Sequence, residues 1–279
     1  MIFSMEFKNN FAKLIAWAIV IIILTGLMIA FFPLLVEPQM TSIVESLLNS
    51  LSSAPKSILG FEEGFDITSI AEYLSLVFHY IGILIYIFAM QIGANSLSKE
   101  QGSGNISYIY SNPISKSDIV TGKLCANTIV YIIFLAIIGI ATFGLLCAVK
   151  TLGINQEYIS NFTTFDIIES IVRIFIGLFA GGLVFMSIGF LFSSFSQSSI
   201  HADAVSTLFI LLVILFTIIG KVVGGSLLTP ASFLPLEVFK PYSFISANIN
   251  IAALGINLVL FIVFIILTYL VYNSKELKY

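Results

Sequence analysis

Residues 14–36 read LIAWAIVIIILTGLMIAFFPLLV and contain no charged side chain. A helix needs about 20 apolar residues to cross a bilayer, so this run is long enough for one span. Five further apolar runs have comparable length, and they occupy residues 72–97, 123–149, 167–193, 204–223 and 247–272. The alternating pattern of a membrane β-barrel is absent. The sequence therefore predicts an all-α, polytopic membrane protein with six transmembrane helices in one transmembrane domain over residues 1–279.

The composition of the whole chain points to lipid as its main solvent. Of the 279 residues, 58% are hydrophobic and 10% are charged, and the mean hydropathy is +1.07. Soluble domains carry about 25% charged residues, and no stretch of this chain has the composition of a separate soluble domain. The net charge of −3 and the pI of 5.4 give no basic surface for nucleic acid. Membrane lipid is therefore an expected partner, and nucleic acid is not.

The basic residues predict how the chain is oriented. With six spans and a cytoplasmic N-terminus, seven of the twelve basic residues are inside: Lys8, Lys13, Lys99, Lys116, Lys123, Lys275 and Lys278. Ten of the fifteen acidic residues are then outside: Glu37, Glu45, Glu62, Glu63, Asp66, Glu72, Glu157, Asp166, Glu169 and Glu237. Basic residues favour the cytoplasmic side of membrane proteins. We expect a multi-pass protein of the plasma membrane with both termini in the cytoplasm.

Three segments outside the spans have their own patterns. Near the N-terminus, Phe3, Phe7, Phe11 and Leu14 share one helical face, and Glu6, Asn9, Asn10 and Lys13 share the opposite face. This spacing predicts a short interfacial helix before the first span, or alternatively the first turns of a longer helix. Apolar residues within 43–51 predict a surface helix that ends near Ala54-Pro55. Residues 224–246 are apolar but contain three prolines, which favours a re-entrant hairpin between spans five and six.

The inventory of catalytic motifs is thin. The sequence has no phosphate-binding loop, no H-E-x-x-H zinc motif and no G-x-S-x-G nucleophile motif, which disfavours a stand-alone membrane enzyme. Polar residues inside spans are costly, so His79, Gln91 and Asn95 are candidates for a substrate path. Each could instead form a hydrogen bond to a neighbouring helix. Two features predict packing: the pair Glu169 and Arg173 at i,i+4, and Gly177-x-x-x-Gly181-Gly182, which would let a neighbouring backbone approach.

The connection between spans two and three, residues 98–123, carries the strongest motif. It reads SKEQGSGNISYIYSNPISKSDIVTGK. Pro113 ends one segment, Ser115 then caps a short helix, and Asp118 completes a capping box. Ile114, Ile119 and Val120 would be apolar contacts on this helix. A capped helix at the membrane surface suits the docking of a partner, although an ordinary amphipathic connector fits the pattern equally.

This connection resembles the type 2 ABC exporter permeases. Their second and third spans are joined by Glu-x-x-x-Gly-Thr, a short run, and Pro-Ile-Ser-basic-x-x-Ile-Val-x-x-Lys. Glu100 matches the glutamate, Pro113-Ile114-Ser115-Lys116 match the turn, and Ile119-Val120 and Lys123 match the remainder. The chain departs from the pattern at residues 101–104, where a basic residue and Gly-Thr are usual. The resemblance extends to the interfacial helix, the six spans, the re-entrant element and the Pro-aromatic stretch at residues 241–244.

In that family the connection forms a coupling helix that sits in a groove of a separate ATPase subunit. The resemblance implies a permease that exports a hydrophobic or amphipathic substrate, such as an antimicrobial peptide, a drug or a lipid-like molecule. It implies an ABC ATPase and a second permease, in a homodimer or a heterodimer, as partners. No cofactor is implied on this chain, because ATP and magnesium bind the ATPase. The implied docking residues are Glu100, Pro113, Ile114, Ser115, Lys116, Asp118, Ile119 and Val120.

One alternative function stays open at this point. The long first outer connection is acidic, so the chain could be a non-transporting sensor or immunity component that binds a peptide there. Co-purification of an ATPase separates the two readings.

Overall fold

The computed structural model describes residues 2–102, 115–151 and 162–275. Its long helices are α1 (Ile2–Leu35), α4 (Ile70–Gly102), α6 (Lys116–Thr151), α8 (Thr164–Phe195), α9 (Ser199–Val223) and α13 (Ile251–Ser274). All six are long and apolar enough to cross a membrane. The predicted all-α architecture with six spans is therefore confirmed. The helices extend beyond the predicted apolar runs at one or both ends, because helical hydrogen bonding continues into the flanking polar residues.

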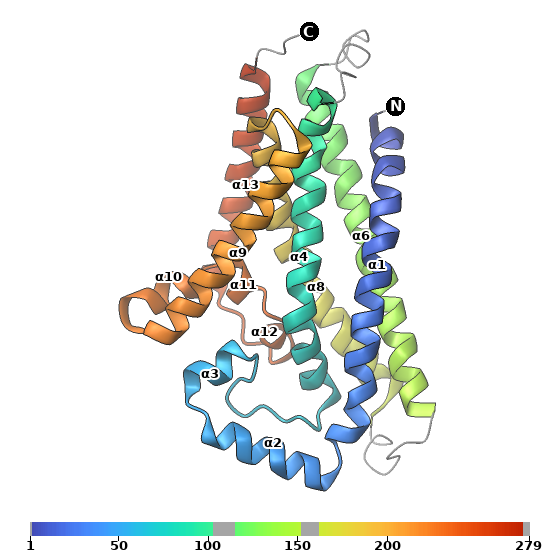
Figure 1. Cartoon of the computed structure of the whole chain (residues 1–279), viewed down its shortest axis with the longest axis vertical. Helices are drawn as coiled ribbons and strands as arrows, with labels where there is room; N and C mark the ends of the chain where they lie inside the picture. Colours follow the sequence, from blue (N-terminus) through green and yellow to red (C-terminus); the bar gives the residue numbers. More distant parts are fainter. Residues whose placement is uncertain (1, 103–114, 152–161, 276–279) are drawn as a thin grey trace.

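The six long helices run up and down in one bundle, with both chain ends at the same end of it (Figure 1). α4 and α8 form the centre of the bundle. In each of them 72% of the most apolar 18-residue stretch is buried, against 28% or less in the other four long helices. At the end opposite the termini lie α2 (Pro38–Ser50) and α3 (Ser53–Ile58), which connect α1 to α4. The remaining short elements connect α9 to α13: η1 (Gly225–Leu227), α10 (Leu228–Ser232), α11 (Pro235–Val238) and α12 (Pro241–Ile245).

Two glycines allow α4 and α8 to pack backbone against backbone. A Cβ added to Gly93 would meet the carbonyl oxygen of Met186, and a Cβ added to Gly189 would meet the carbonyl oxygen of Met90. Small residues permit this close approach without a side chain in between.

The predicted glycine motif of the fourth span has a different role. A Cβ at Gly177 would meet the ring of Phe244, and Cβ atoms at Gly181 and Gly182 would meet the rings of Tyr86 and Tyr131. The prediction that a neighbouring backbone approaches there is therefore wrong, because aromatic side chains occupy the space.

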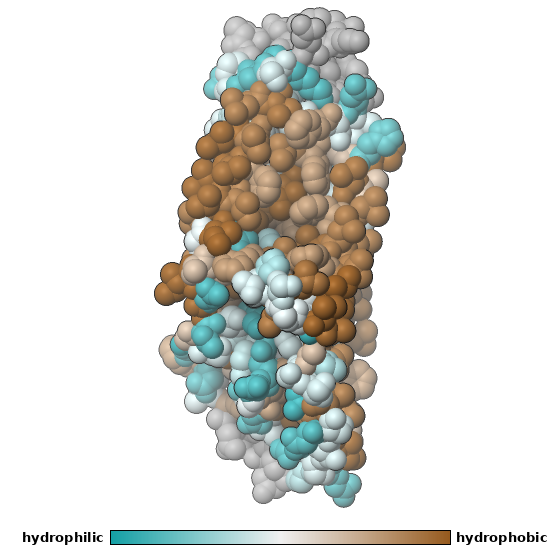
Figure 2. Space-filling view, turned by 90° about the vertical axis from the view of Figure 1, so that its left-hand side faces the viewer, coloured by the Kyte–Doolittle hydropathy of each residue, from teal (hydrophilic) through white to brown (hydrophobic). Residues whose placement is uncertain are grey.

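The outside of the bundle is apolar along α9 and α13. On the face shown in Figure 2, apolar side chains form a band with polar side chains above and below it. α9 exposes Leu208, Leu211, Leu212, Leu215 and Val222, and α13 exposes Leu258, Val259, Ile262, Ile266 and Leu270. Such a band fits the hydrocarbon core of a bilayer, where exposed apolar side chains carry no hydrophobic cost.

The structure corrects the prediction of a separate interfacial helix at the N-terminus. α1 is a single helix from Ile2 to Leu35, which is the alternative of a longer helix. Two residues of its predicted polar face, Glu6 and Asn10, are turned into the protein at 3% and 5% exposed, whereas Asn9 is exposed. On the predicted apolar face Phe11 is 49% exposed and Leu14 is buried. Partners on α6 make this burial possible, since Asn10 Nδ2 donates to Asn127 Oδ1 at 2.7 Å.

The outer connections agree with the sequence in kind and differ in detail. α2 lies across the end of the bundle with no buried residue, as expected for a surface helix. It ends at Ser50, and Ala54-Pro55 lie instead inside α3. The connection from α9 to α13 folds back into the bundle, where Val238 and Phe239 are buried. The Tyr86 hydroxyl, midway along α4, donates to the Phe239 carbonyl at 3.2 Å. The depth of this hairpin in a bilayer stays a prediction.

Candidate functional site

The start of α6 carries the Ser115 cap that the sequence predicts, with one change in the predicted capping box: the Asp118 carboxylate meets the Ser115 hydroxyl. Ser115 Oγ accepts a hydrogen bond from the Asp118 amide at 3.1 Å and donates to Asp118 Oδ2 at 2.7 Å. The capped segment is not a short helix of its own, however. It is the first turn of α6, which runs from Lys116 to Thr151 without a proline to interrupt it.

The predicted docking residues separate into three groups in the structure. Ser115 and Asp118 are exposed, and Glu100 lies in the last turn of α4. Ile119 and Val120 are 0% and 1% exposed and belong to the core of this chain. Pro113 and Ile114 lie outside the described residues. The side chains of Ile119 and Val120 therefore face this chain's own interior and not its surface.

The first turns of α6 are attached to the C-terminal end of α13. Lys116 Nζ donates to the carbonyl oxygens of Asn273 and Lys275, at 3.1 and 2.8 Å. One turn further on, the hydroxyls of Thr121 and Tyr269 are 2.7 Å apart. A cation beside the last carbonyls of a helix is favourable, because those oxygens have no partner within the helix.

The same junction continues to α8. Lys275 Nζ donates to the carbonyl oxygens of Ser194 and Ser196 at 3.1 and 3.0 Å. Burial lowers the pKa of the Lys275 ammonium from its usual value. The beginning of α6, the end of α13 and the end of α8 are therefore held together by hydrogen bonds.

A buried polar network joins α1, α4 and α6 near this junction. Lys123 Nζ lies 3.6 Å from Glu6 Oε2, and both side chains are almost fully buried, at 1% and 3% exposed. Lys123 Nζ also donates to the carbonyl oxygen of Ser96. Asn127 Nδ2 donates to Ser96 Oγ at 3.0 Å. Sequence reasoning assigned Lys123 to the motif but gave it no partner, because Glu6 is more than a hundred residues away in sequence.

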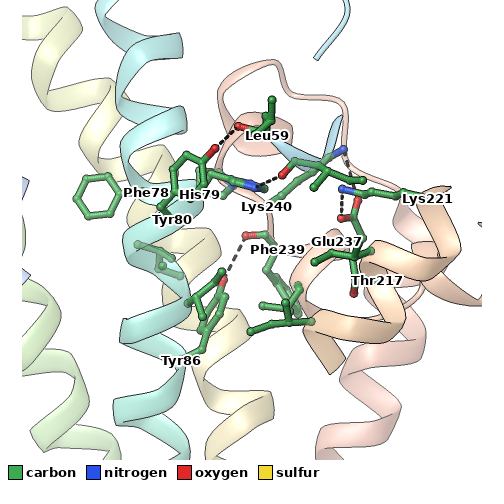
Figure 3. A pocket seen from close by; sticks show the side chains of 18 residues that line it. Leu59, Phe78, His79, Tyr80, Tyr86, Thr217, Lys221, Glu237, Phe239 and Lys240 are labelled. Atoms are coloured by element: carbon green, nitrogen blue, oxygen red, sulfur yellow. Dashed lines mark hydrogen bonds and ion pairs between the residues drawn. The ribbon is translucent and has the colours of Figure 1, made fainter. Parts of the chain in front are cut away.

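At the opposite end of the bundle, a pocket of about 250 Å³ lies between α4, α9 and the hairpin that contains α11 (Figure 3). We call it the outer pocket, because it lies at the end of the bundle that the sequence predicts to face outside. It is lined by Ile58, Leu59, Phe78, His79, Tyr80, Gly82, Ile83, Tyr86, Leu178, Ile214, Thr217, Ile218, Lys221, Leu236, Glu237, Phe239, Lys240 and Pro241. Most of these side chains are aliphatic or aromatic, as is usual for sites that bind small molecules.

The charged groups of the outer pocket are paired with one another. Lys221 Nζ lies 2.5 Å from Glu237 Oε1, and Lys240 Nζ lies 3.8 Å from Glu237 Oε2. Lys240 Nζ also lies 2.7 Å from Glu62 Oε1 in the connection that follows α3. These ion pairs attach α9 and the hairpin to the outer connection. The sequence placed the four residues on the outer side but gave no sign that they meet.

A polar cavity adjoins these ion pairs. It is lined by Ser53, Lys56, Ser57, Phe61, Glu62, Glu63, Tyr242, Ser246 and Asn248. Burial and the nearby carboxylates of Glu72 and Glu62 raise the pKa of the Tyr242 hydroxyl from its usual value. The Lys240–Glu62 pair therefore lies between an apolar pocket and a polar one.

The three residues predicted for a substrate path do not come together. His79 lines the outer pocket, and its Nε2 lies 3.2 Å from the Ile58 carbonyl oxygen at the end of α3. Asn95 lies toward the other end of α4, where its Nδ2 donates to Asp203 Oδ1 on α9 at 2.6 Å and to the Gln91 carbonyl at 3.0 Å. Asn95 therefore has the interhelical hydrogen bond that the sequence allowed as an alternative.

The described part of the chain brings no three His, Cys, Asp or Glu side chains together in the way that metal ligands require. The fold and both regions define a polytopic helical membrane protein with a hydrogen-bonded helix junction at one end and an apolar pocket at the other. The family described as ABC-2 family transporter protein matches residues 1–277. The chain therefore belongs to this family, and it is a membrane permease subunit of an ABC transporter. No individual curated protein matches it.

Membership of this family indicates which subunit hydrolyses ATP to drive transport. Its members are transmembrane subunits that generally lack an ATPase site of their own and work with an ABC ATPase.

Proposed function

We propose that this chain is one half of an exporter that moves hydrophobic or amphipathic molecules out of the cell. In this proposal two permeases, identical or different, form the path through the plasma membrane, and both termini of the chain are cytoplasmic. ATP and magnesium are bound and used by two separate ATPase subunits. The whole chain acts as one permease domain. Antimicrobial peptides, drugs and lipid-like molecules all fit the substrate class.

The observation that supports coupling is the helix junction at the end that carries both termini. The segment before α6 is the proposed contact with the ATPase, and α6 starts with a capped turn that is attached to α13 through Lys116. α13 in turn is attached to α8 through Lys275. A push on this segment would therefore tilt several spans together, which is what coupling to ATPase closure requires.

The docking surface that we propose contains Glu100, Pro113, Ile114, Ser115 and Asp118. Lys116 contributes indirectly, because its ammonium is bonded to α13. Ile119 and Val120 are excluded from the surface, because they are buried within the chain.

The test compares two isoleucines five residues apart. The chain is expressed with its candidate ATPase as Ile114→Asp or Ile119→Asp. We expect Ile114→Asp to reach normal membrane abundance but to lose ATPase co-purification, because a charge would enter an apolar contact. Ile119→Asp should lower the abundance itself, because the charge would enter the chain's own core. Vesicles that contain both wild-type subunits should export a fluorescent amphiphile only with ATP.

Normal ATPase binding and transport by Ile114→Asp would show that the docking assignment is wrong. If the wild-type permease co-purifies with no ATPase and no transport is measured, the alternative of a sensor or immunity component is favoured.

A further inference from the structure

The outer pocket is closed on one side and open on the other. Its inner side is formed by Phe78, Tyr86, Leu178 and Phe239, all of which are buried. Three of its lining residues come from three different elements and are well exposed: Leu59 at 40%, Tyr80 at 41% and Ile218 at 37%. These three residues mark the opening of the pocket toward the outside of the molecule.

Most polar groups of the pocket already have partners within the chain. Lys221, Glu237 and Lys240 form ion pairs (Figure 3). The hydroxyls of Tyr80 and Tyr86 donate to the carbonyl oxygens of Leu59 and Phe239. A charged ligand group would lose its hydration in this pocket and would have to compete with these existing ion pairs and hydrogen bonds for a partner, which is costly. The pocket therefore suits an uncharged, apolar group.

The volume and the position of the pocket narrow the ligand further. A dry cavity of about 150 Å³ is large enough for benzene, so about 250 Å³ admits a larger ring or a folded alkyl segment. Ile218 belongs to α9, which exposes apolar side chains along its length. A molecule dissolved in lipid beside α9 would reach the opening without passing through water.

We propose that the outer pocket binds the uncharged alkyl or aryl group of a membrane-soluble amphiphile, which enters from lipid between Leu59, Tyr80 and Ile218. The head group stays outside the pocket, whatever its charge. This inference rests on the proposed function for the statement that the bound molecule is a transport substrate. The binding itself needs no ATPase, so it can be tested on the permease alone.

The probes are three dodecyl amphiphiles that carry a diazirine in the alkyl chain and a trimethylammonium, maltoside or phosphate head group. The full chain is placed in phosphatidylcholine nanodiscs, illuminated, and the labelled residues are identified by mass spectrometry. We expect saturable labelling of residues 78–86 and 214–221 with all three probes, and competition by the unlabelled amphiphile.

Two neighbouring residues of α9 provide a matched pair of variants. Ile218 lines the pocket and is 37% exposed, whereas Ile219 is 39% exposed and does not line it. Ile218→Trp should weaken labelling by about tenfold, because altered apolar fit changes binding on this scale. Leu59→Trp, on the other side of the opening, should do the same. Ile219→Trp should label like wild type at equal abundance.

Three results would overturn the proposal. The first is labelling that is not saturable and spreads over the exposed faces of α9 and α13. The second is equal labelling of Ile218→Trp and Ile219→Trp. The third is labelling by only one of the three probes, which would show that the head-group charge decides binding. Saturable labelling without ATP-driven export would leave the site in place and would count against the proposed function alone.

Discussion

Lys123→Met would test whether the buried pair with Glu6 holds α1 against the bundle. The substitution keeps a long apolar side chain but removes the cation 3.6 Å from the Glu6 carboxylate, which is 3% exposed. Among the described residues, the donor that remains is Asn10 Nδ2, which is 3.4 Å from Glu6 Oε1, beyond the usual range for a good hydrogen bond. Removing one partner of a buried pair costs about 3–5 kcal/mol, so we expect a loss near this value.

The chain contains a single tryptophan, Trp17, whose ring centroid lies 6.1 Å from that of Phe88 on α4. Its fluorescence therefore reports the packing of α1 against α4 during unfolding in mixed micelles. A loss of about 3 kcal/mol would lower the folded-to-unfolded ratio more than a hundredfold. Lys8→Met is the control, because Lys8 is an exposed cation on the same helix.

The double variant Glu6→Leu/Lys123→Met should regain most of the lost stability, because it leaves no charge of the pair behind. Equal stability of Lys123→Met and Lys8→Met would show that Glu6 does not depend on the ion pair. If the double variant is no more stable than Lys123→Met, the loss of stability comes from altered packing at position 123 and not from an unpaired Glu6 charge.

Two further predictions use the same unfolding assay. Gly189→Ala should destabilise the chain by about 1–3 kcal/mol, because its Cβ would meet a backbone carbonyl of α4. Gly255→Ala, whose Cβ meets nothing within 4 Å, should not destabilise the chain and should gain up to about 1 kcal/mol, because alanine is the better helix former; equal effects of the two variants would contradict the backbone contact. Arg173→Ala should cost less than about 1 kcal/mol, because its 2.6 Å pair with Glu169 is exposed at 44% and 42%, and a larger loss would mean that the pair is shielded from solvent.

Features that depend on neighbours in sequence were predictable. The six spans follow from runs of apolar residues, because the cost of burying polar groups in lipid acts on each segment separately. The Ser115 cap and the pair of Glu169 and Arg173 follow from spacings of three and four residues in a helix. These predictions needed no knowledge of which helix packs against which.

Features that depend on the facing helix were not predictable in the same way. An amphipathic pattern in residues 3–14 shows that two faces differ, but not which one meets protein. The sequence predicted Ile119 and Val120 to contact a partner protein, but both side chains lie in the core of this chain. Gly93 and Gly189 carry no motif, yet each lies directly against a backbone carbonyl of the facing helix, α8 or α4.

The apolar runs therefore determine that this chain enters a membrane and how many times it crosses, and the spacing of polar residues determines the cap at which α6 begins. Tertiary packing decides the partners of each helix face. It turns Glu6 and Asn10 inward toward α6, and it collects Leu59, Tyr86, Ile218 and Glu237 from four separate segments around one pocket. The physical reason is that lipid solvates every apolar face alike, so the choice among these faces comes from close packing and buried hydrogen bonds between distant residues.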